Sequence, residues 1–193
     1  MDTSSGWPQN VFVEDDAGFG GTKVVSTITR RGYASDGYEL SLRGQNTNRF
    51  SDAVVSAYGP WWTDFRATLS LTPRSTSLAS GMVFRLNNEG FYAFLLYVPA
   101  HTNEAYYKVL RREYQGKSVD LIGWQRTDLG PAKLPGAGRK LTVEAHRDLF
   151  VFFIDGRKLN SVRDATIVDG FVGMVLHGTG QARFHDLLVE QLP

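Results

Sequence analysis

Apolar and polar residues alternate in short segments along most of this chain. Each segment spans roughly six to ten residues and ends near Gly, Asn, Asp or Pro, as strands and turns do. Residues 64–72 show the alternation most clearly, because Phe65, Ala67, Leu69 and Leu71 are separated by polar residues. The periodicity of an amphipathic helix is almost absent. This pattern predicts an all-β protein.

The clearest single element is a hairpin predicted over residues 81–97, where Asn88-Glu89-Gly90 separates two apolar segments. Such a loop favours a type I turn followed by a left-handed glycine, and it places Phe84 opposite Phe94. One face then carries Met82, Phe84, Leu86, Tyr92, Phe94 and Leu96, and the other carries Val83, Arg85, Phe91, Ala93, Leu95 and Tyr97. Because both faces are apolar apart from Arg85, we expect the hairpin in the middle of a sandwich.

Further strands are predicted on both sides of this hairpin. They cover residues 24–30, 37–43, 50–57, 64–72, 104–112, 119–126, 140–146, 150–154, 158–162, 171–177 and 181–190, with a short strand at 11–13. About thirteen strands with mostly antiparallel neighbours predict an all-β, antiparallel two-sheet jelly-roll sandwich. Residues 91–97 and 150–154, apolar on both faces, are expected near the sheet centres. No linker divides residues 1–193, so we expect one domain with a loop-like segment at 1–10.

Composition and charge narrow the function classes. The formal net charge is +1, from 21 basic and 20 acidic residues without a basic stripe, so nucleic acid is not an expected partner. Cysteine is absent, which excludes disulfides and thiolate chemistry. No apolar run reaches the ~18 residues of a membrane helix, so membrane insertion is not expected. No signal peptide is recognisable, and a cytoplasmic protein and a trimmed mature domain both fit.

Six segments combine turn glycines, core aromatics and a closing Phe-x-Asp. They are Gly81-Met-Val-Phe-Arg-Leu, Gly90-Phe-Tyr-Ala-Phe, Leu141-Thr-Val-Glu, Phe150-Val-Phe-Phe-Ile-Asp-Gly, Asp169-Gly-Phe-Val-Gly-Met and Phe184-His-Asp-Leu-Leu-Val. In this order they resemble the concanavalin A-like lectin/glucanase superfamily, and above all its bacterial laminin-G-like and family 16-like jelly rolls. The resemblance implies a concanavalin A-like fold, carbohydrate bound on the concave sheet or its rim loops, and an extracytoplasmic location.

The resemblance also allows a test for catalysis. Glucanases of this superfamily carry Glu-x-Asp-x-x-Glu on one strand, and no glutamate of this chain begins that pattern. The acidic cluster Glu14-Asp15-Asp16 is expected in a loop. We therefore expect a non-catalytic binding domain. The alternative is a sugar-processing glycoside hydrolase or lyase of the same superfamily, for which Glu144 with Asp120 or Asp64 is the first pair to consider.

A carbohydrate or cell-surface glycan is the expected partner, and it needs an aromatic platform with a few polar groups. The candidate ligand-binding residues are Arg85, Tyr97, Trp124, Trp61, Trp62 and Glu144. Some of these residues could instead have a structural role. Trp61 and Trp62 could cap the core, and Arg85 could form an internal ion pair with Glu144. A structural or sensor module with a protein partner and no sugar ligand is the remaining alternative.

No cofactor is expected. The resemblance implies one exception, a structural calcium ion held by loop carboxylates such as Asp15, Asp16 or Asp169. His177 and His185 lie on consecutive predicted strands and could face each other across a hairpin. Zinc needs three or four ligands, so we expect these to be surface or rim histidines.

Overall fold

Fourteen strands run through the part of the chain that the computed structural model describes, which is residues 10–16, 25–44, 53–57, 59–74, 79–99, 104–113, 118–127 and 138–193. They are β1 (Asn10–Asp16), β2 (Val25–Ala34), β3 (Gly37–Gly44), β4 (Ala53–Ala57), β5 (Phe65–Pro73), β6 (Ala79–Leu86), β7 (Gly90–Tyr97), β8 (Ala105–Glu113), β9 (Ser118–Thr127), β10 (Arg139–His146), β11 (Leu149–Ile154), β12 (Arg157–Arg163), β13 (Phe171–His177) and β14 (Gly180–Gln191). Most of the predicted N-terminal loop, residues 1–9, lies outside the described residues.

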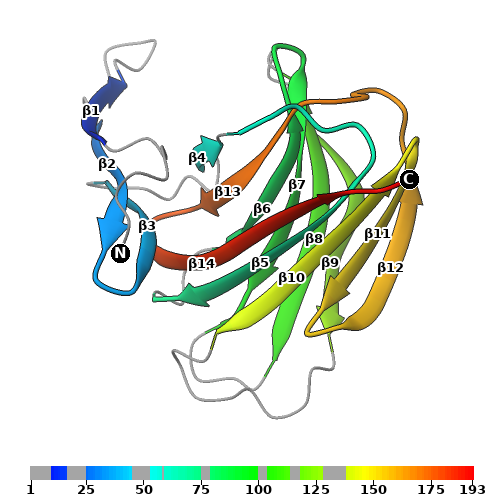
Figure 1. The fold of residues 1–193 in the computed structure, drawn as a ribbon. Coiled ribbons are helices and arrows are strands. Elements are labelled where there is room, and N and C mark those ends of the chain that lie inside the picture. Colours follow the sequence, from blue (N-terminus) through cyan, green and yellow to red (C-terminus); the bar gives the residue numbers. More distant parts are fainter. Residues whose placement is uncertain are drawn as a thin grey trace.

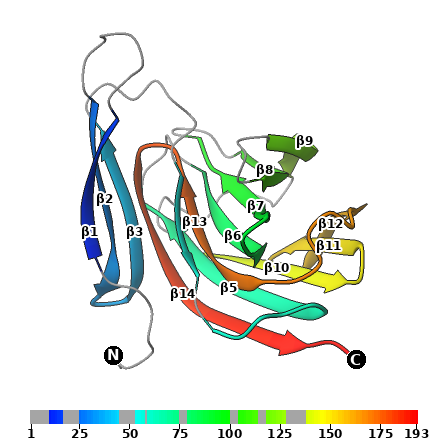
Figure 2. The same ribbon diagram turned by 90° about the horizontal axis from the view of Figure 1, so that it is seen from above.

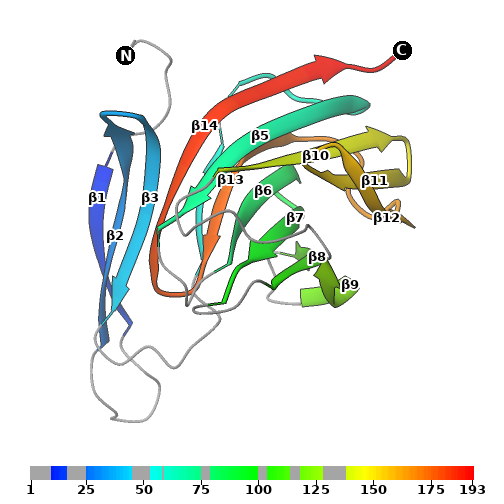
Figure 3. The ribbon, with the colours of Figure 1, turned by 90° about the horizontal axis from the view of Figure 1, so that it is seen from below.

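The strands form two antiparallel sheets packed face to face (Figure 1). The larger sheet has the order β1-β2-β3-β14-β5-β10-β11-β12, and the smaller has the order β4-β13-β6-β7-β8-β9. The eight-stranded sheet bends around the six-stranded one, with β1, β2 and β3 standing at one side (Figures 2 and 3). The predicted antiparallel two-sheet jelly-roll sandwich is confirmed. Among the described residues, no helix is long and apolar enough to cross a membrane.

Aromatic rings fill the space between the sheets. The Phe84 ring of β6 stacks on Tyr92 with centroids 5.3 Å apart, and it meets Phe150 at 5.2 Å in an edge contact. Phe65 and Phe152 of the larger sheet contact the same ring, each at 6.3 Å. Such pairs contribute about 0.5–1.5 kcal/mol each beyond the area they bury. Inward residues from both sheets therefore form one continuous core.

The central hairpin forms inside the six-stranded sheet, but its register differs from the prediction. Phe84 pairs with Tyr92 and not with Phe94. The Asn87 side chain accepts a hydrogen bond from the Glu89 N–H at 2.8 Å, and this local turn begins the loop one residue early. The register moves by two residues. Because the side-chain period of a strand is also two, the hairpin faces are largely preserved.

A β-bulge in β6 exchanges the faces of two residues. On the β13 side, Val83 and Leu86 pair with Gly173 and Phe171, so β6 carries one residue more than its partner. Arg85 has a φ of 50° within this bulge. Its side chain turns into the core, while Leu86 packs on the opposite face of the sheet. The predicted faces of Arg85 and Leu86 are therefore wrong, because the alternation pattern assumes an unbroken ladder.

Alternation predicts the central strands of the larger sheet correctly. β5 and β10 bury their apolar residues, and Arg66 pairs with Glu144 on the outer face. Two other expectations are wrong. β11 lies next to the edge strand β12, and the second face of β11 is only half-buried. The acidic cluster 14–16 belongs to β1, where pairing with β2 overrides the loop-like local composition.

A candidate binding surface on the six-stranded sheet

The outer face of the six-stranded sheet, turned away from the aromatic core, is apolar in its middle. This outer cluster comprises Ala79, Val83, Phe91, Ala93, Leu95, Leu110 and Val175. All of these residues are buried, and Tyr97 packs against them from the end of β7. Exposed aromatic and charged side chains begin beyond Tyr97, on β8 and β9. The accessible part of this face therefore lies at the β8–β9 side.

A second bulge turns Trp124 toward this outer face. Ile122 belongs to the inner core, so regular alternation along β9 would return Trp124 to the inner side. The register between β8 and β9 shifts after Tyr107, and Gly123 and Trp124 together lie opposite Lys108. The extra residue reverses the direction of the indole. Trp124 is 44% exposed, which is unusual for so large an apolar side chain.

Three aromatic rings meet on this side. The Trp124 ring lies edge-to-face with Tyr97, with centroids 6.0 Å apart. Tyr97 pairs across β7 and β8 with Tyr106, and these two rings lie 6.4 Å apart. The tyrosines are half-buried and support the exposed indole. We call this region the aromatic surface. Its members are Tyr97, Tyr106 and Trp124 with the charged residues Glu104, Lys108, Asp120 and Arg126.

Two ion pairs belong to the aromatic surface. The Lys108 ammonium lies 5.8 Å from the centroid of the indole ring and 2.8 Å from the Asp120 carboxylate. The Arg126 guanidinium lies 3.1 Å from Glu104. The Tyr106 hydroxyl donates to the other Glu104 oxygen at 2.5 Å, and this hydrogen bond raises the pKa of the phenol. An apolar ring plane is thus combined with fixed donors and acceptors.

The structure brings together two of the six candidate residues on this surface, Tyr97 and Trp124. The sequence reasoning missed Tyr106, Lys108 and Arg126. One signal was available, because Tyr106 and Lys108 are two residues apart on a predicted strand and must share a face. The bulge that adds Trp124 to that face also had a signal, because Gly123 lies inside the predicted strand 119–126 and a glycine within a strand often marks a bulge.

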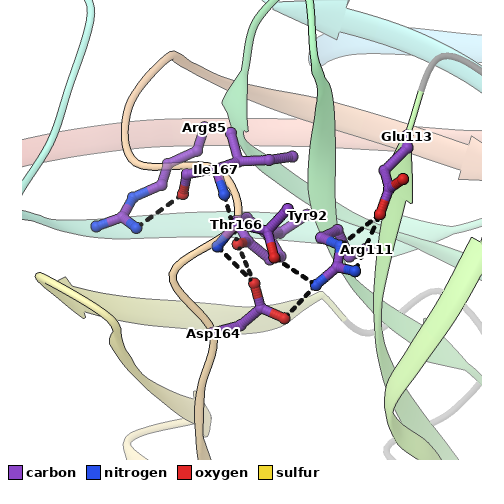
Figure 4. A network of polar contacts seen from close by, with 7 residues as sticks. All are labelled: Arg85, Tyr92, Arg111, Glu113, Asp164, Thr166 and Ile167. Atoms are coloured by element: carbon purple, nitrogen blue, oxygen red, sulfur yellow. Dashed lines mark hydrogen bonds and ion pairs between the residues drawn. The ribbon is translucent and has the colours of Figure 1, made fainter.

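Arg85 lies in the core and not on the aromatic surface. Its side chain is 1% exposed. The guanidinium donates to the carbonyl oxygens of Ile167 at 3.0 Å, Thr63 at 2.9 Å and Arg147 at 2.6 Å (Figure 4 draws the first of these). Burial lowers the pKa of Arg85. Its nearby carboxylate is Asp64 at 3.9 Å, not the glutamate that the sequence suggested. A side chain held in this way is closed to a ligand.

A neighbouring polar network fastens the segment that joins β12 to β13, and hence one sheet to the other (Figure 4). Asp164 accepts hydrogen bonds from the Tyr92 hydroxyl at 2.7 Å, from the Thr166 N–H at 2.9 Å and from Arg111. Burial would raise the pKa of Asp164, but these hydrogen bonds and the Arg111 charge lower it. Burial raises the pKa of Tyr92. Arg111 and Asp164 are 53 residues apart, so no local pattern indicates the contact.

Two of the acids considered for catalysis, Glu144 and Asp120, belong to different sheets. Glu144 lies on the outer face of the eight-stranded sheet, 3.0 Å from Arg66. Asp120 belongs to β9 of the other sheet and pairs with a lysine. Asp64 directly precedes β5, and its carboxylate lies 3.2 Å from a ring nitrogen of His146, the last residue of β10. Glu144 and Asp120 are therefore not paired across a common site.

The adjacent residues Trp61 and Trp62 lie in different surroundings. Trp61 is 55% exposed and meets Phe171 in an edge contact, with centroids 5.6 Å apart. The side chain of Trp62 packs against the core, and its backbone N–H donates to the Gly170 carbonyl at 3.0 Å. Phe171 pairs with the C-terminal end of β6, whereas Tyr97 pairs with its N-terminal end. Neither tryptophan therefore joins the aromatic surface.

Metal ligands do not cluster in the described part of the chain, where no three His, Asp, Glu or Cys side chains gather around one point. Of the calcium candidates, Asp15 and Asp16 lie in β1, and their side chains fall outside the described part. His177 belongs to the six-stranded sheet and His185 to the eight-stranded sheet. These two histidines do not face each other across a hairpin, because the chain changes sheets between them.

Comparisons with known proteins agree with the fold. No family model matches the chain, and no curated protein matches its sequence. Among solved structures, the carbohydrate-binding module CBM66 from Bacillus subtilis aligns with a TM-score of 0.59 at 18% identity, covering 96% of both chains. A Bacillus subtilis protein of unknown function with a galectin-like fold gives 0.53 at 11% identity, over 96% of this chain and 89% of that one.

A tetrameric galectin from the ball sponge Cinachyrella sp. aligns with a TM-score of 0.51 at 11% identity, over 71% of this chain and 98% of the galectin. At these identities the likeness establishes the fold alone. The chain has the jelly-roll architecture of galectins and carbohydrate-binding modules, consistent with the concanavalin A-like sandwich that the resemblance implies.

Proposed function

We propose that this protein is a non-catalytic domain that binds carbohydrate on the aromatic surface. The observation that carries the proposal is Trp124, an indole 44% exposed that a β-bulge turns outward beside Tyr97 and two ion pairs. A flat, supported ring of this kind suits the apolar C–H face of a sugar ring. The surrounding charged groups can take sugar hydroxyls as charge-assisted hydrogen-bond partners.

The architecture supports the same proposal. Structures with this fold include one that is named a carbohydrate-binding module and one that is named a galectin. We further propose that the chain belongs with the laminin-G-like and family 16-like jelly rolls, on the motifs of its central hairpin and last strands. Polysaccharides and cell-surface glycans are accordingly the ligands to test.

A glycan array and affinity electrophoresis in polysaccharide gels test this function. The intact protein should be retained by at least one glycan. Trp124→Ala should weaken that binding by about tenfold or more, because central aromatic anchors commonly contribute over 1.4 kcal/mol. Trp124 is exposed on the edge strand β9, so the variant should keep its fold, which circular dichroism checks.

The matched control is Leu188→Ala, which removes a 57% exposed apolar side chain from β14 in the other sheet. This variant should bind as the unchanged protein does. The proposal fails if no glycan is retained, or if Trp124→Ala and Leu188→Ala bind equally well.

A further inference from the structure

The charges of the aromatic surface balance each other. Its described cations are Lys108 and Arg126, and its described carboxylates are Asp120 and Glu104. Each cation is paired with one of the carboxylates, at 2.8 Å and 3.1 Å. Neither cation therefore offers an uncompensated positive charge to a ligand.

Lys108 is the more confined of the two cations. Its side chain is only 18% exposed and lies between the indole ring and Asp120, whose own side chain is 51% exposed. A ligand stacked on Trp124 would thus meet the Asp120 carboxylate more readily than the ammonium group. An acidic sugar there would place two negative charges side by side, which is costly.

The second ion pair, between Arg126 and Glu104, likewise has its charges matched. Both Glu104 oxygens are occupied, one by Arg126 and the other by the Tyr106 hydroxyl. Since this hydroxyl donates its proton to Glu104, only its acceptor lone pair is left for a ligand. Arg126 is 64% exposed and keeps further N–H donors. The site offers donors and acceptors together.

We propose, building on the proposed function, that the aromatic surface selects uncharged glycans over acidic ones. A sugar hydroxyl is both a donor and an acceptor, so it matches a donor–acceptor pair such as Lys108–Asp120 without disturbing it. A carboxylate or sulfate accepts only, and beside the indole it would have to displace Asp120 from Lys108. Asp120 is then a specificity-determining residue, which excludes anionic ligands.

The experiment compares binding of the protein to neutral polysaccharides (xylan, galactan and mannan) with its binding to acidic ones (polygalacturonate, hyaluronan and chondroitin sulfate). Both classes are placed on one array, together with the neutral glycans that test the proposed function. The unchanged protein should favour its neutral ligand by about tenfold or more, because like charges in contact oppose binding. Binding to that ligand should change little between low and physiological salt, because it brings no net charge.

Asp120→Asn releases Lys108 from its partner. This variant should bind acidic polymers about threefold or more tightly than the unchanged protein, since an exposed charge acts weakly. The matched control is Asp148→Asn, which breaks a similar ion pair with Arg163, 2.6 Å long, on the eight-stranded sheet. This control should leave binding to both classes unchanged.

The outcomes separate the two proposals. Retention of acidic glycans equal to or above that of neutral ones, abolished by Trp124→Ala, would overturn the selectivity and leave the binding function standing. The same selectivity in the Asp120→Asn and unchanged proteins would overturn the role of Asp120. Absence of all glycan binding would overturn the function and this inference with it.

Discussion

Arg85 shows how a single residue acquires its role from its surroundings. The bulge in β6 and a φ of 50° turn its guanidinium into the core, where it joins the carbonyls of three separate segments. These segments precede β5, β11 and β13. Each carbonyl would lack that donor if the cation were removed, and an unmade buried hydrogen bond is costly. Arg85 therefore organises one end of the sandwich.

Arg85→Met should lower the free energy of unfolding by about 3 kcal/mol or more, because it keeps most of the volume but removes every donor. Urea denaturation followed by fluorescence measures this. Arg66→Met is the control, since Arg66 forms an ion pair on the surface and is 50% exposed. Its loss should cost less than about 1 kcal/mol. Equal effects of the two substitutions would refute the structural role of Arg85.

Asp164 makes a contribution that depends on pH. Its folded-state pKa lies below the ordinary carboxyl value of 3.8, because the hydrogen bonds and Arg111 outweigh the opposing effect of burial. The stabilisation is therefore fully present above pH 3.8, and it is lost as the pH falls through the lower folded-state pKa. Asp164→Asn lacks this contribution at every pH.

Asp164→Asn should lose about 2 kcal/mol of stability at neutral pH. The gap from the unchanged protein should narrow as the pH falls below 3.8. Urea unfolding at a series of pH values measures both effects. Asp186→Asn, at an exposed carboxylate of β14, should track the unchanged protein throughout. A gap that stays constant or widens in acid would contradict the assignment.

At the scale of elements, the β6–β7 pair is packed closely enough to require a glycine. A Cβ added at Gly81 would lie 1.9 Å from the Phe94 carbonyl oxygen, which belongs to the backbone and cannot move aside. Gly123 in the β9 bulge is the opposite case, because a Cβ there would meet nothing within 4 Å. Two strand glycines therefore differ sharply in what they tolerate.

Gly81→Ala should destabilise the protein by about 3 kcal/mol, since the two strands must separate to admit the methyl group. Gly123→Ala should change stability by less than about 0.5 kcal/mol. Thermal and urea unfolding of the two variants, side by side, test this contrast. Comparable losses in both would mean that the spacing of β6 and β7 is not the constraint.

Alternation predicted most of the strands because inward residues must be apolar wherever one face meets the core. It failed where pairing departs from a regular ladder. The bulges at Arg85 and Gly123 each insert one residue and reverse the side chains that follow. The prediction placed only residues 11–13 of β1 in a strand, because the acidic residues 14–16 favour a loop locally, and pairing with β2 holds them in the strand.

At the scale of the whole molecule, the two sheets share a core but present different outer faces. The outer face of the eight-stranded sheet is polar at its centre. Arg66 pairs there with Glu144, and the hydroxyl oxygens of Thr68 and Thr142 lie 3.1 Å apart. The six-stranded sheet carries the outer apolar cluster and the aromatic surface. The candidate residues from the sequence are distributed over both outer faces and the core. In the part of the chain that the structure describes, the aromatic surface combines an exposed ring, Trp124, with two ion pairs.

The sequence by itself determined the all-β class, the sandwich and the central hairpin, because these follow from local alternation and turn residues. It also identified Tyr97 and Trp124 among the candidates. Only the tertiary structure decided that Arg85 is buried, that Glu144 faces away from Trp124, and that Lys108 is already paired with Asp120. These outcomes depend on bulges and on contacts between strands, and pairing across a sheet is not written into any local stretch of chain.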